Sequence, residues 1–179
     1  MSISQSSPEA EIGYHLREAS VLAYRHGYGD VLGYARSKEF IAAQILGHRI
    51  SPTLEGADAF RDKDAIEISL EYKSTVGKYC KGHYSGISVQ ETWPEQERYL
   101  FEEKIAKYPE HYYNRFENGV MVESWMMEGK DVYRILLPKL KKSWDNRHNR
   151  KDPRLSADIT WADIQEHGIQ VVKEGKRVI

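Results

Sequence analysis

The sequence predicts an α/β protein in which a central mixed sheet is flanked by helices. Two segments near the N-terminus carry apolar residues at the three- and four-residue spacing of amphipathic helices, and segments further along alternate strictly, as strands do. At 179 residues, the chain is long enough to bury its own core. Because no repeat or low-complexity linker divides it, we expect a single domain over 1–179.

Composition limits the classes of protein to consider. The 40% hydrophobic and 30% charged content is ordinary for a soluble protein, and no apolar run approaches the ~20 residues that cross a bilayer. The first residues are polar and acidic, unlike a signal peptide, and the single Cys80 cannot form an internal disulfide. We therefore expect a cytoplasmic, reducing location and no membrane partner. A net charge of −1 does not by itself indicate nucleic acid.

Two helices are predicted before the first strand. Ser7 precedes a proline, which is typical of an N-cap and first turn, and the helical spacing of apolar residues continues to about Tyr24. Ser37 is expected to cap a second helix, and Gly47 to end it. Glu39 then lies in the first turn of the second helix.

The clearest strand is predicted over 65–73, where apolar and polar residues alternate. Side chains two apart on a strand share a face, so Glu71 and Lys73 lie side by side on the polar one. A polar turn precedes this strand, which predicts an antiparallel partner over 57–60. With the turn centred on Asp62 and Lys63, Asp58 would pair with about Glu67 or Ser69, and a bulge or a strong twist would be needed to bring it to Glu71.

The remaining elements follow from the same patterns. Strands are expected at 85–89, 111–116, 120–127, 131–137 and 155–161, a helix from Pro94 to about Pro109, and a short helix ending at Gly168. The segment 138–144 is ambiguous between a helical turn and an extended piece. The segment 147–154 is expected to be an exposed basic loop.

Asp58, Glu71 and Lys73 suggest a chemistry. A hard divalent cation is held by one or two carboxylates, water and substrate phosphate oxygens, and Asp58 with Glu71 would supply two carboxylates. Such an ion polarises a phosphate and acidifies water, while Lys73 orients that water or offsets developing charge. The expected reaction is hydrolysis of a phosphodiester.

The same residues resemble a known family. Asp58, twelve residues, and then Glu71-Tyr72-Lys73 is similar to the PD-(D/E)xK signature of restriction endonucleases and related nucleases, with Ala57 in place of the proline. That family's core runs helix, three strands, helix, strand, and the predicted elements from about 37 to 137 follow this order. The resemblance implies a restriction-endonuclease-like core, with 138–179 as an extension that carries the basic loop and further sheet and helix.

The resemblance also implies a function and the roles of individual residues. It implies a Mg²⁺-dependent, sequence-specific endonuclease that cuts double-stranded DNA, commonly as a homodimer. The carbonyl of Tyr72 would join Asp58 and Glu71 as a metal ligand. Glu39 would join the catalytic group Asp58, Glu71 and Lys73, in a second metal site or by orienting water.

Cations after the predicted core are candidates for nucleic-acid binding. They can contact phosphates, although a solvated surface loop is an equally good interpretation. They are Lys139, Lys141, Lys142, Arg147, Arg150, Lys151 and Arg154. The segment between Gly82 and Trp93 is a further candidate for DNA contact.

Several alternatives remain open. A carboxylate and a lysine two apart occur often by chance on a strand. The chain could be a structure-selective or repair nuclease of the same superfamily, or a nucleic-acid-binding subunit that does not cut. Cys80 could be a nucleophile with His83 as base, although a structural cysteine is the better interpretation. The histidines lack zinc-site spacing.

Overall fold

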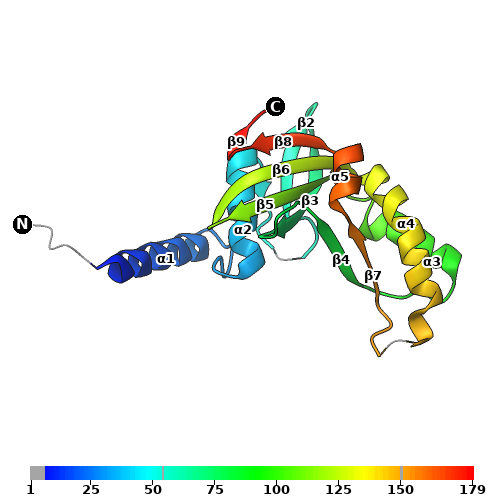
Figure 1. Cartoon of the computed structure of the whole chain (residues 1–179). Helices are drawn as coiled ribbons and strands as arrows, with labels where there is room; N and C mark the ends of the chain where they lie inside the picture. The colour runs from blue at the N-terminus through cyan, green and yellow to red at the C-terminus, as the bar shows by residue number, and fades with distance from the viewer. Residues whose placement is uncertain (1–6, 54, 150) are drawn as a thin grey trace, which may run out of the picture.

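The chain forms a mixed α/β fold in the computed structural model, which describes residues 7–53, 55–149 and 151–179 (Figure 1). The helices are α1 (Pro8–Arg25), α2 (Tyr34–Leu46), α3 (Trp93–Tyr99), α4 (Gly129–Asp145) and α5 (Trp161–His167), with a π-helical turn η1 (Leu100–Lys104) and a 3₁₀ turn η2 (Arg147–Asn149). The strands are β1 (Arg49–Ile50), β2 (Ala59–Lys63), β3 (Ile66–Thr75), β4 (Gly82–Ile87), β5 (Glu110–Glu117), β6 (Val120–Glu128), β7 (Leu155–Ile159), β8 (Ile169–Lys173) and β9 (Lys176–Arg177).

Seven of the strands form one mixed sheet. Their order is β1-β2-β3-β5-β6-β8-β9, and every neighbouring pair is antiparallel except β3 and β5, which run parallel. Strands β4 and β7 form a separate antiparallel pair. The prediction of an α/β fold with a mixed sheet flanked by helices is therefore confirmed. Within the described ranges, no helix combines the length and apolar character needed to span a bilayer.

Two apolar clusters hold helices against the sheet. One lies beneath α2, where Ala42 and Leu46 pack with Leu70 of β3 and Phe116 of β5. The other joins α4 and α5 to the β4–β7 pair. In Figure 1 the elements α3, α4, β4 and β7 gather at one end of the molecule, and α1 extends away from the other. Strand β3 therefore has α2 on one face and the second cluster towards the other.

Both predicted N-terminal helices are present, and the second begins earlier than predicted. Helix α1 is capped by Ser7, whose hydroxyl accepts the N–H of Ala10 at 3.3 Å. Helix α2 ends at Gly47, whose φ of 71° is the left-handed conformation that favours glycine. The predicted cap at Ser37 is wrong, because α2 begins at Tyr34 after Gly33, so Glu39 lies in the second turn.

The hairpin between β2 and β3 turns later than the sequence predicted. Asp64 and Ala65 have φ values of 53° and 64°, and two left-handed residues in succession form the tight turn that suits a twisted hairpin. Ala59 consequently pairs with Leu70, and the N–H of Asp58, the residue just before β2, donates to the carbonyl of the same Leu70 at 3.0 Å. The expected pairing of Asp58 with Glu67 or Ser69 is wrong, because Glu67 pairs with Asp62 and Ser69 with Phe60.

The strand predicted over 131–137 is also wrong, because this segment belongs to helix α4. Val132, Leu136 and Leu140 recur every four residues and are completely buried in the cluster that contains β7. Pro138 lies inside the helix, where its missing N–H removes one helical hydrogen bond. Tertiary packing of that apolar stripe therefore outweighs the local alternation and the proline, and it resolves 138–144 as helical.

The other elements exist as predicted, with shifted bounds. The helix opened by Pro94 ends in the π-helical turn at Lys104, earlier than the predicted end near Pro109. The strand expected at 85–89 begins earlier, at Gly82. Strands β5, β6 and β7 and helix α5 occupy their predicted segments, and the residues 147–149 and 151–154 are largely exposed.

Candidate active site

Glu71 and Lys73 lie on the face of β3 that points away from α2. The alternate residues Leu70 and Tyr72 are buried beneath α2, and strand geometry sends their neighbours to the opposite face. The ammonium of Lys73 donates to Oε1 of Glu71 at 2.5 Å. The sequence prediction that these two side chains lie together is confirmed.

Asp58 joins this pair through the backbone of β3. Its Oδ2 accepts the N–H of Tyr72 at 2.6 Å, while its own N–H donates to the carbonyl of Leu70 at 3.0 Å. Strand β2 begins one residue later, so the Asp58 side chain takes the hydrogen bond that another strand residue would otherwise accept. In an extended strand the N–H and C=O of one residue point to the same edge, and the Tyr72 carbonyl therefore shares that edge with Asp58.

Burial and a like charge act together on Asp58. Desolvation, the nearby carboxylate of Glu71 and the negative charge of Glu39 together raise the pKa of its carboxyl to about 7. The Tyr72 N–H and the Lys73 ammonium oppose this rise without cancelling it. Two carboxylates that repel one another in a partly buried site favour a proton or a cation between them.

Glu39 lies near this pair but is already engaged. Its Oε2 accepts a hydrogen bond from the buried guanidinium of Arg36 at 3.0 Å, and Arg36 also donates to the carbonyl of Ser51. This ion pair ties α2 to the segment that follows β1. The structure thus gives Glu39 a structural role beside its electrostatic effect on Asp58, and its place in a metal site stays a prediction.

Glu71 and Lys73 open into a cleft of about 270 Å³ between β3, β4 and the end of η1 with the residues that follow it. Two further lysines, Lys104 and Lys107, line it, and both are exposed. Ser85 also lines it, which places part of the segment between Gly82 and Trp93 beside the predicted site. The cleft therefore combines one carboxylate with three ammonium groups, a charge balance that suits a phosphate.

No sequence pattern pointed to Lys104 and Lys107 as residues of the site. They follow a helix more than thirty residues after Glu71, and isolated lysines in such a segment usually lie on a solvated surface. Only the parallel pairing of β3 with β5 returns the chain to this side of the sheet. No sequence pattern available to us could have placed these lysines beside Lys73.

A buried hydrogen-bond network holds the walls of the cleft. The carbonyl of Ile105 accepts from Nε2 of His111 at 3.0 Å, so Nδ1 is free to accept from the Tyr84 hydroxyl at 2.8 Å. The hydroxyl of Tyr113 lies 2.9 Å from that of Tyr84. Burial lowers the pKa of His111 to about 3, which keeps the imidazole neutral. The Lys73 ammonium lies 4.9 Å above the Tyr84 ring, so this network also positions Lys73.

Most of the predicted nucleic-acid-binding cations are engaged elsewhere within the chain. Three form ion pairs: Lys139 with Asp163, Lys141 with Asp145, and Arg154 with Asp152. The guanidinium of Arg147 packs 3.6 Å from the centre of the Trp144 ring. Among the residues that the structure describes, Lys142 and Lys151 are exposed and have no acidic partner. Arg150 lies outside the described residues.

The alternative with Cys80 as a nucleophile is disfavoured. Its side chain is completely buried, and burial raises the pKa of the thiol to about 12. Nδ1 of His83 lies 2.6 Å from Asp158 on the neighbouring strand β7. Both observations fit a structural cysteine.

The donor set of the site fits magnesium better than zinc. Over the described ranges, no three side chains of His, Cys, Asp or Glu are grouped closely enough to hold a metal ion. Magnesium needs only one or two carboxylates, because it keeps water and binds substrate phosphates as well. Asp58 and Glu71, with the carbonyl of Tyr72, meet that requirement.

Comparison with known proteins does not assign the chain to a family. No protein-family model and no curated protein matches the chain.

Proposed function

We propose that this protein is a magnesium-dependent endonuclease that hydrolyses phosphodiester bonds in double-stranded DNA at a specific sequence. The observation that carries the proposal is the register of β2 and β3. It brings Asp58, just before β2, alongside the backbone of Leu70 and Tyr72 and holds its carboxylate on the N–H of Tyr72, while Glu71 and Lys73 lie side by side on one face of β3.

Asp58, Glu71 and the carbonyl of Tyr72 are the groups that would hold the magnesium ion. When bound, the ion supplies a Lewis acid that polarises the phosphate and lowers the pKa of a nearby water. The repulsion between the two carboxylates is relieved by a cation, so binding is favourable. Lys73 donates hydrogen bonds to the attacking water or to the phosphate oxygen on which charge develops.

The cleft supports a nucleic acid as substrate. Lys104 and Lys107 line it together with Lys73, and each ammonium can neutralise one backbone phosphate. Tyr108 also lines it and is largely buried, which limits access of bulk water to one wall. Because phosphates recur along a strand, three separated lysines fit a polymer better than a small phosphate ester.

The order of elements supports a restriction-endonuclease-like core. Helix α2, strands β2, β3 and β4, helix α3 and strand β5 follow the order helix, three strands, helix, strand. Two features differ from a single central sheet: the short β1 is added at one edge, and β4 pairs with β7 outside the main sheet. We extend the proposal to a homodimer acting on duplex DNA, as for the restriction enzymes that this arrangement resembles.

The direct test is incubation of purified protein with plasmid DNA and Mg²⁺, with EDTA as the metal-free control. We expect discrete fragments, and Lys73→Ala is expected to cut on the order of 100-fold more slowly, because it loses a charge at the reacting phosphate. Lys173→Ala is a matched control, since Lys173 is exposed on β8 and does not line the cleft. A smear would favour a structure-selective or repair nuclease. Binding without cutting would favour a non-catalytic subunit.

The role of the cleft lysines can be tested by binding alone. We expect the double variant Lys104→Ala/Lys107→Ala to bind duplex DNA more weakly in EDTA. The slope of log affinity against log salt should become shallower by about 2, because each phosphate contact contributes roughly 0.9. Fluorescence anisotropy over a range of salt concentrations measures both quantities. If Lys142→Ala/Lys151→Ala lowers the slope and the cleft variant does not, DNA binds at the C-terminal cations instead.

A further inference from the structure

One buried tyrosine differs from the others in its hydroxyl group. In the part of the chain that the structure describes, the buried tyrosines are Tyr72, Tyr84, Tyr108, Tyr112 and Tyr113. A buried tyrosine hydroxyl usually has a hydrogen-bond partner. The hydroxyl of Tyr72 meets a histidine, that of Tyr112 donates to a carboxylate, and those of Tyr84 and Tyr113 lie 2.9 Å apart. Tyr108 is the exception, because its hydroxyl has no partner among the described residues.

The Tyr108 hydroxyl is open to the cleft. Tyr108 is not among the described residues that have a side-chain polar atom both sealed from solvent and without a partner, so its hydroxyl oxygen is in contact with solvent. The whole residue is only 7% exposed, and it lines the cleft together with Glu71 and Lys73. A substrate in the cleft therefore meets this hydroxyl.

The surroundings of Tyr108 hold its ring in place. Its N–H donates to the carbonyl of Ile105 at 3.2 Å, and its own carbonyl oxygen packs against Gly129. The ring lies edge-on to the buried imidazole of His111, with 6.1 Å between the ring centres. The ammonium of Lys107 lies 5.0 Å from the centre of the Tyr108 ring. The hydroxyl is thus a preorganised group, which needs little rearrangement when it meets a substrate.

The protonation state of Tyr108 makes it a donor. Burial and the negative charges of Glu71 and Asp58 together raise the pKa of its hydroxyl to about 12. The hydroxyl therefore keeps its proton at neutral pH, and it can donate a hydrogen bond to an anion but cannot act as a base. It supplies this donor beside two carboxylates without adding a further charge to the site.

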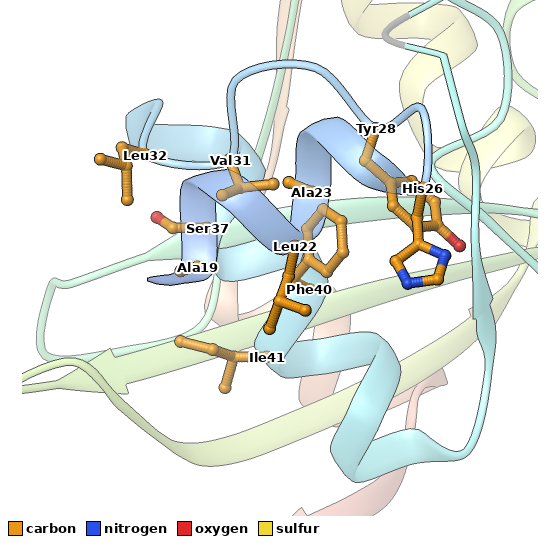
Figure 2. A pocket seen from close by; sticks show the side chains of 10 residues that line it. All are labelled: Ala19, Leu22, Ala23, His26, Tyr28, Val31, Leu32, Ser37, Phe40 and Ile41. Atoms are coloured by element: carbon orange, nitrogen blue, oxygen red, sulfur yellow. The ribbon is translucent and has the colours of Figure 1, made fainter. Parts of the chain in front are cut away.

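A larger cavity shows by contrast what the cleft offers to a phosphate. The groove between α1 and α2 has a volume of about 450 Å³, and Figure 2 shows its lining, which comes from the C-terminal half of α1, from α2 and from the segment between them. Among the described residues that line it there is no lysine or arginine. A phosphate would lose its hydration there without meeting a cation. The cleft beside Tyr108 is therefore the better phosphate site.

We propose that Tyr108 is a catalytic residue, whose hydroxyl donates a hydrogen bond to a non-bridging oxygen of the phosphate that is hydrolysed. The inference rests on the proposed function, which puts that phosphate beside Glu71 and Lys73. In the reaction, the oxygen of water bonds to phosphorus and one phosphorus–oxygen ester bond breaks. Its electron pair goes to the leaving oxygen, which takes up the proton that the water releases. The non-bridging oxygens stay negative throughout, and Tyr108 stabilises one of them without giving up its proton.

The first experiment tests the free hydroxyl without any reaction. Urea unfolding in EDTA is measured for Tyr108→Phe and for Tyr112→Phe, which make the same chemical change at two buried tyrosines. We expect Tyr112→Phe to lower the midpoint, because it removes a hydrogen bond to Glu110. Tyr108→Phe should leave the midpoint unchanged. An equal fall in both variants would mean that the Tyr108 hydroxyl has a partner within the chain, and it would overturn the proposal.

The second experiment measures single-turnover cleavage with Mg²⁺ on a duplex that spans the cut site. At saturating enzyme, Tyr108→Phe is expected to cut about 10- to 100-fold more slowly than wild type, because a donor to a charged oxygen is lost. Binding of the duplex in EDTA should change by less than about threefold, since the hydrogen bond strengthens in the transition state. Tyr79→Phe is the matched control, because Tyr79 is 48% exposed and does not line the cleft.

A third experiment separates a contact with the phosphate from a role in packing. Sulfur replaces one non-bridging oxygen at the cut site, in each of its two stereoisomers, and sulfur is the weaker hydrogen-bond acceptor. For one stereoisomer, we expect the substitution to slow wild type more than it slows Tyr108→Phe, because the variant has no hydrogen bond left to weaken. A tyrosine that only packs would give equal ratios for both stereoisomers.

The outcomes distinguish this inference from the proposed function. If Tyr108→Phe cuts as fast as Tyr79→Phe, or if both proteins respond equally to sulfur, the role of Tyr108 is overturned and the nuclease remains. A variant that binds more weakly but cuts at the wild-type rate once saturated also overturns it, because the hydroxyl then lies away from the reacting phosphate. Wild type that does not cut DNA refutes the proposed function and this inference with it.

Discussion

Replacing Asp58 with asparagine is expected to abolish DNA cleavage and, at the same time, to stabilise the metal-free protein at neutral pH. Cleavage should fall by about 1,000-fold or more, because the cation loses one of its two carboxylates. Stability should rise because asparagine still accepts the N–H of Tyr72 but removes the repulsion with Glu71. A gain in stability with a loss of activity separates a functional carboxylate from a structural one.

The pH dependence of this effect has a definite sign. The pKa of Asp58 is raised from 3.8 to about 7, so the folded state binds the proton more tightly than the unfolded state does. The stabilising contribution is full below about pH 4 and is lost as the pH rises towards 7. Allowing for partial exposure, we expect wild type to lose on the order of 2 kcal/mol over this interval relative to Asp58→Asn.

Urea unfolding in EDTA at about pH 4.5 and pH 8 measures this difference. Asp62→Asn serves as the matched control, because Asp62 is exposed near the tip of the same hairpin. Added Mg²⁺ should raise the melting temperature of wild type and leave that of Asp58→Asn nearly unchanged. Equal stability of the two proteins at both pH values would contradict the electrostatic account of the site. An equal response to Mg²⁺ would contradict the metal-ligand assignment.

Replacing Gly129 with alanine is expected to cause a large loss of stability. Gly129 begins α4, and its N–H donates to the carbonyl of Pro109 at 2.8 Å. A Cβ at this position would lie 2.0 Å from the backbone oxygen of Tyr108, so one of the two segments must move. We expect a loss of about 3 kcal/mol in the free energy of unfolding. Because Tyr108 lines the cleft, cleavage should also slow in the protein that remains folded.

Chemical denaturation of Gly129→Ala beside Gly13→Ala tests this expectation. A Cβ at Gly13 has no neighbour within 4 Å, so alanine there should stabilise α1 by up to about 1 kcal/mol through its helix propensity. The two variants make the same chemical change in two helices. An unaltered midpoint for Gly129→Ala would mean that α4 can shift away from Tyr108 without cost.

Local patterns in the sequence predicted the elements that depend on neighbouring residues. The alternation along β3 placed Glu71 and Lys73 on one face, and the structure places them in contact. The cap at Ser7 and the stop at Gly47 were recognisable because each satisfies backbone groups within one turn of the residue itself. The segment that begins at Val132 fits both the alternation of a strand and the spacing of a helix. It forms a helix because its whole apolar stripe is buried in that conformation.

By itself, then, the sequence determined that one strand presents a carboxylate beside a lysine, and that an aspartate precedes it on a partner strand. Only the tertiary structure decided that Asp58 bonds to the Tyr72 N–H beside Glu71, that Lys104 and Lys107 line the same cleft as Lys73, and that Lys139, Lys141 and Arg154 are already paired. The physical reason is one of range. Side-chain direction within a strand follows from covalent geometry, whereas the register of a hairpin and the meeting of distant segments depend on turn conformation and on burial across the whole core.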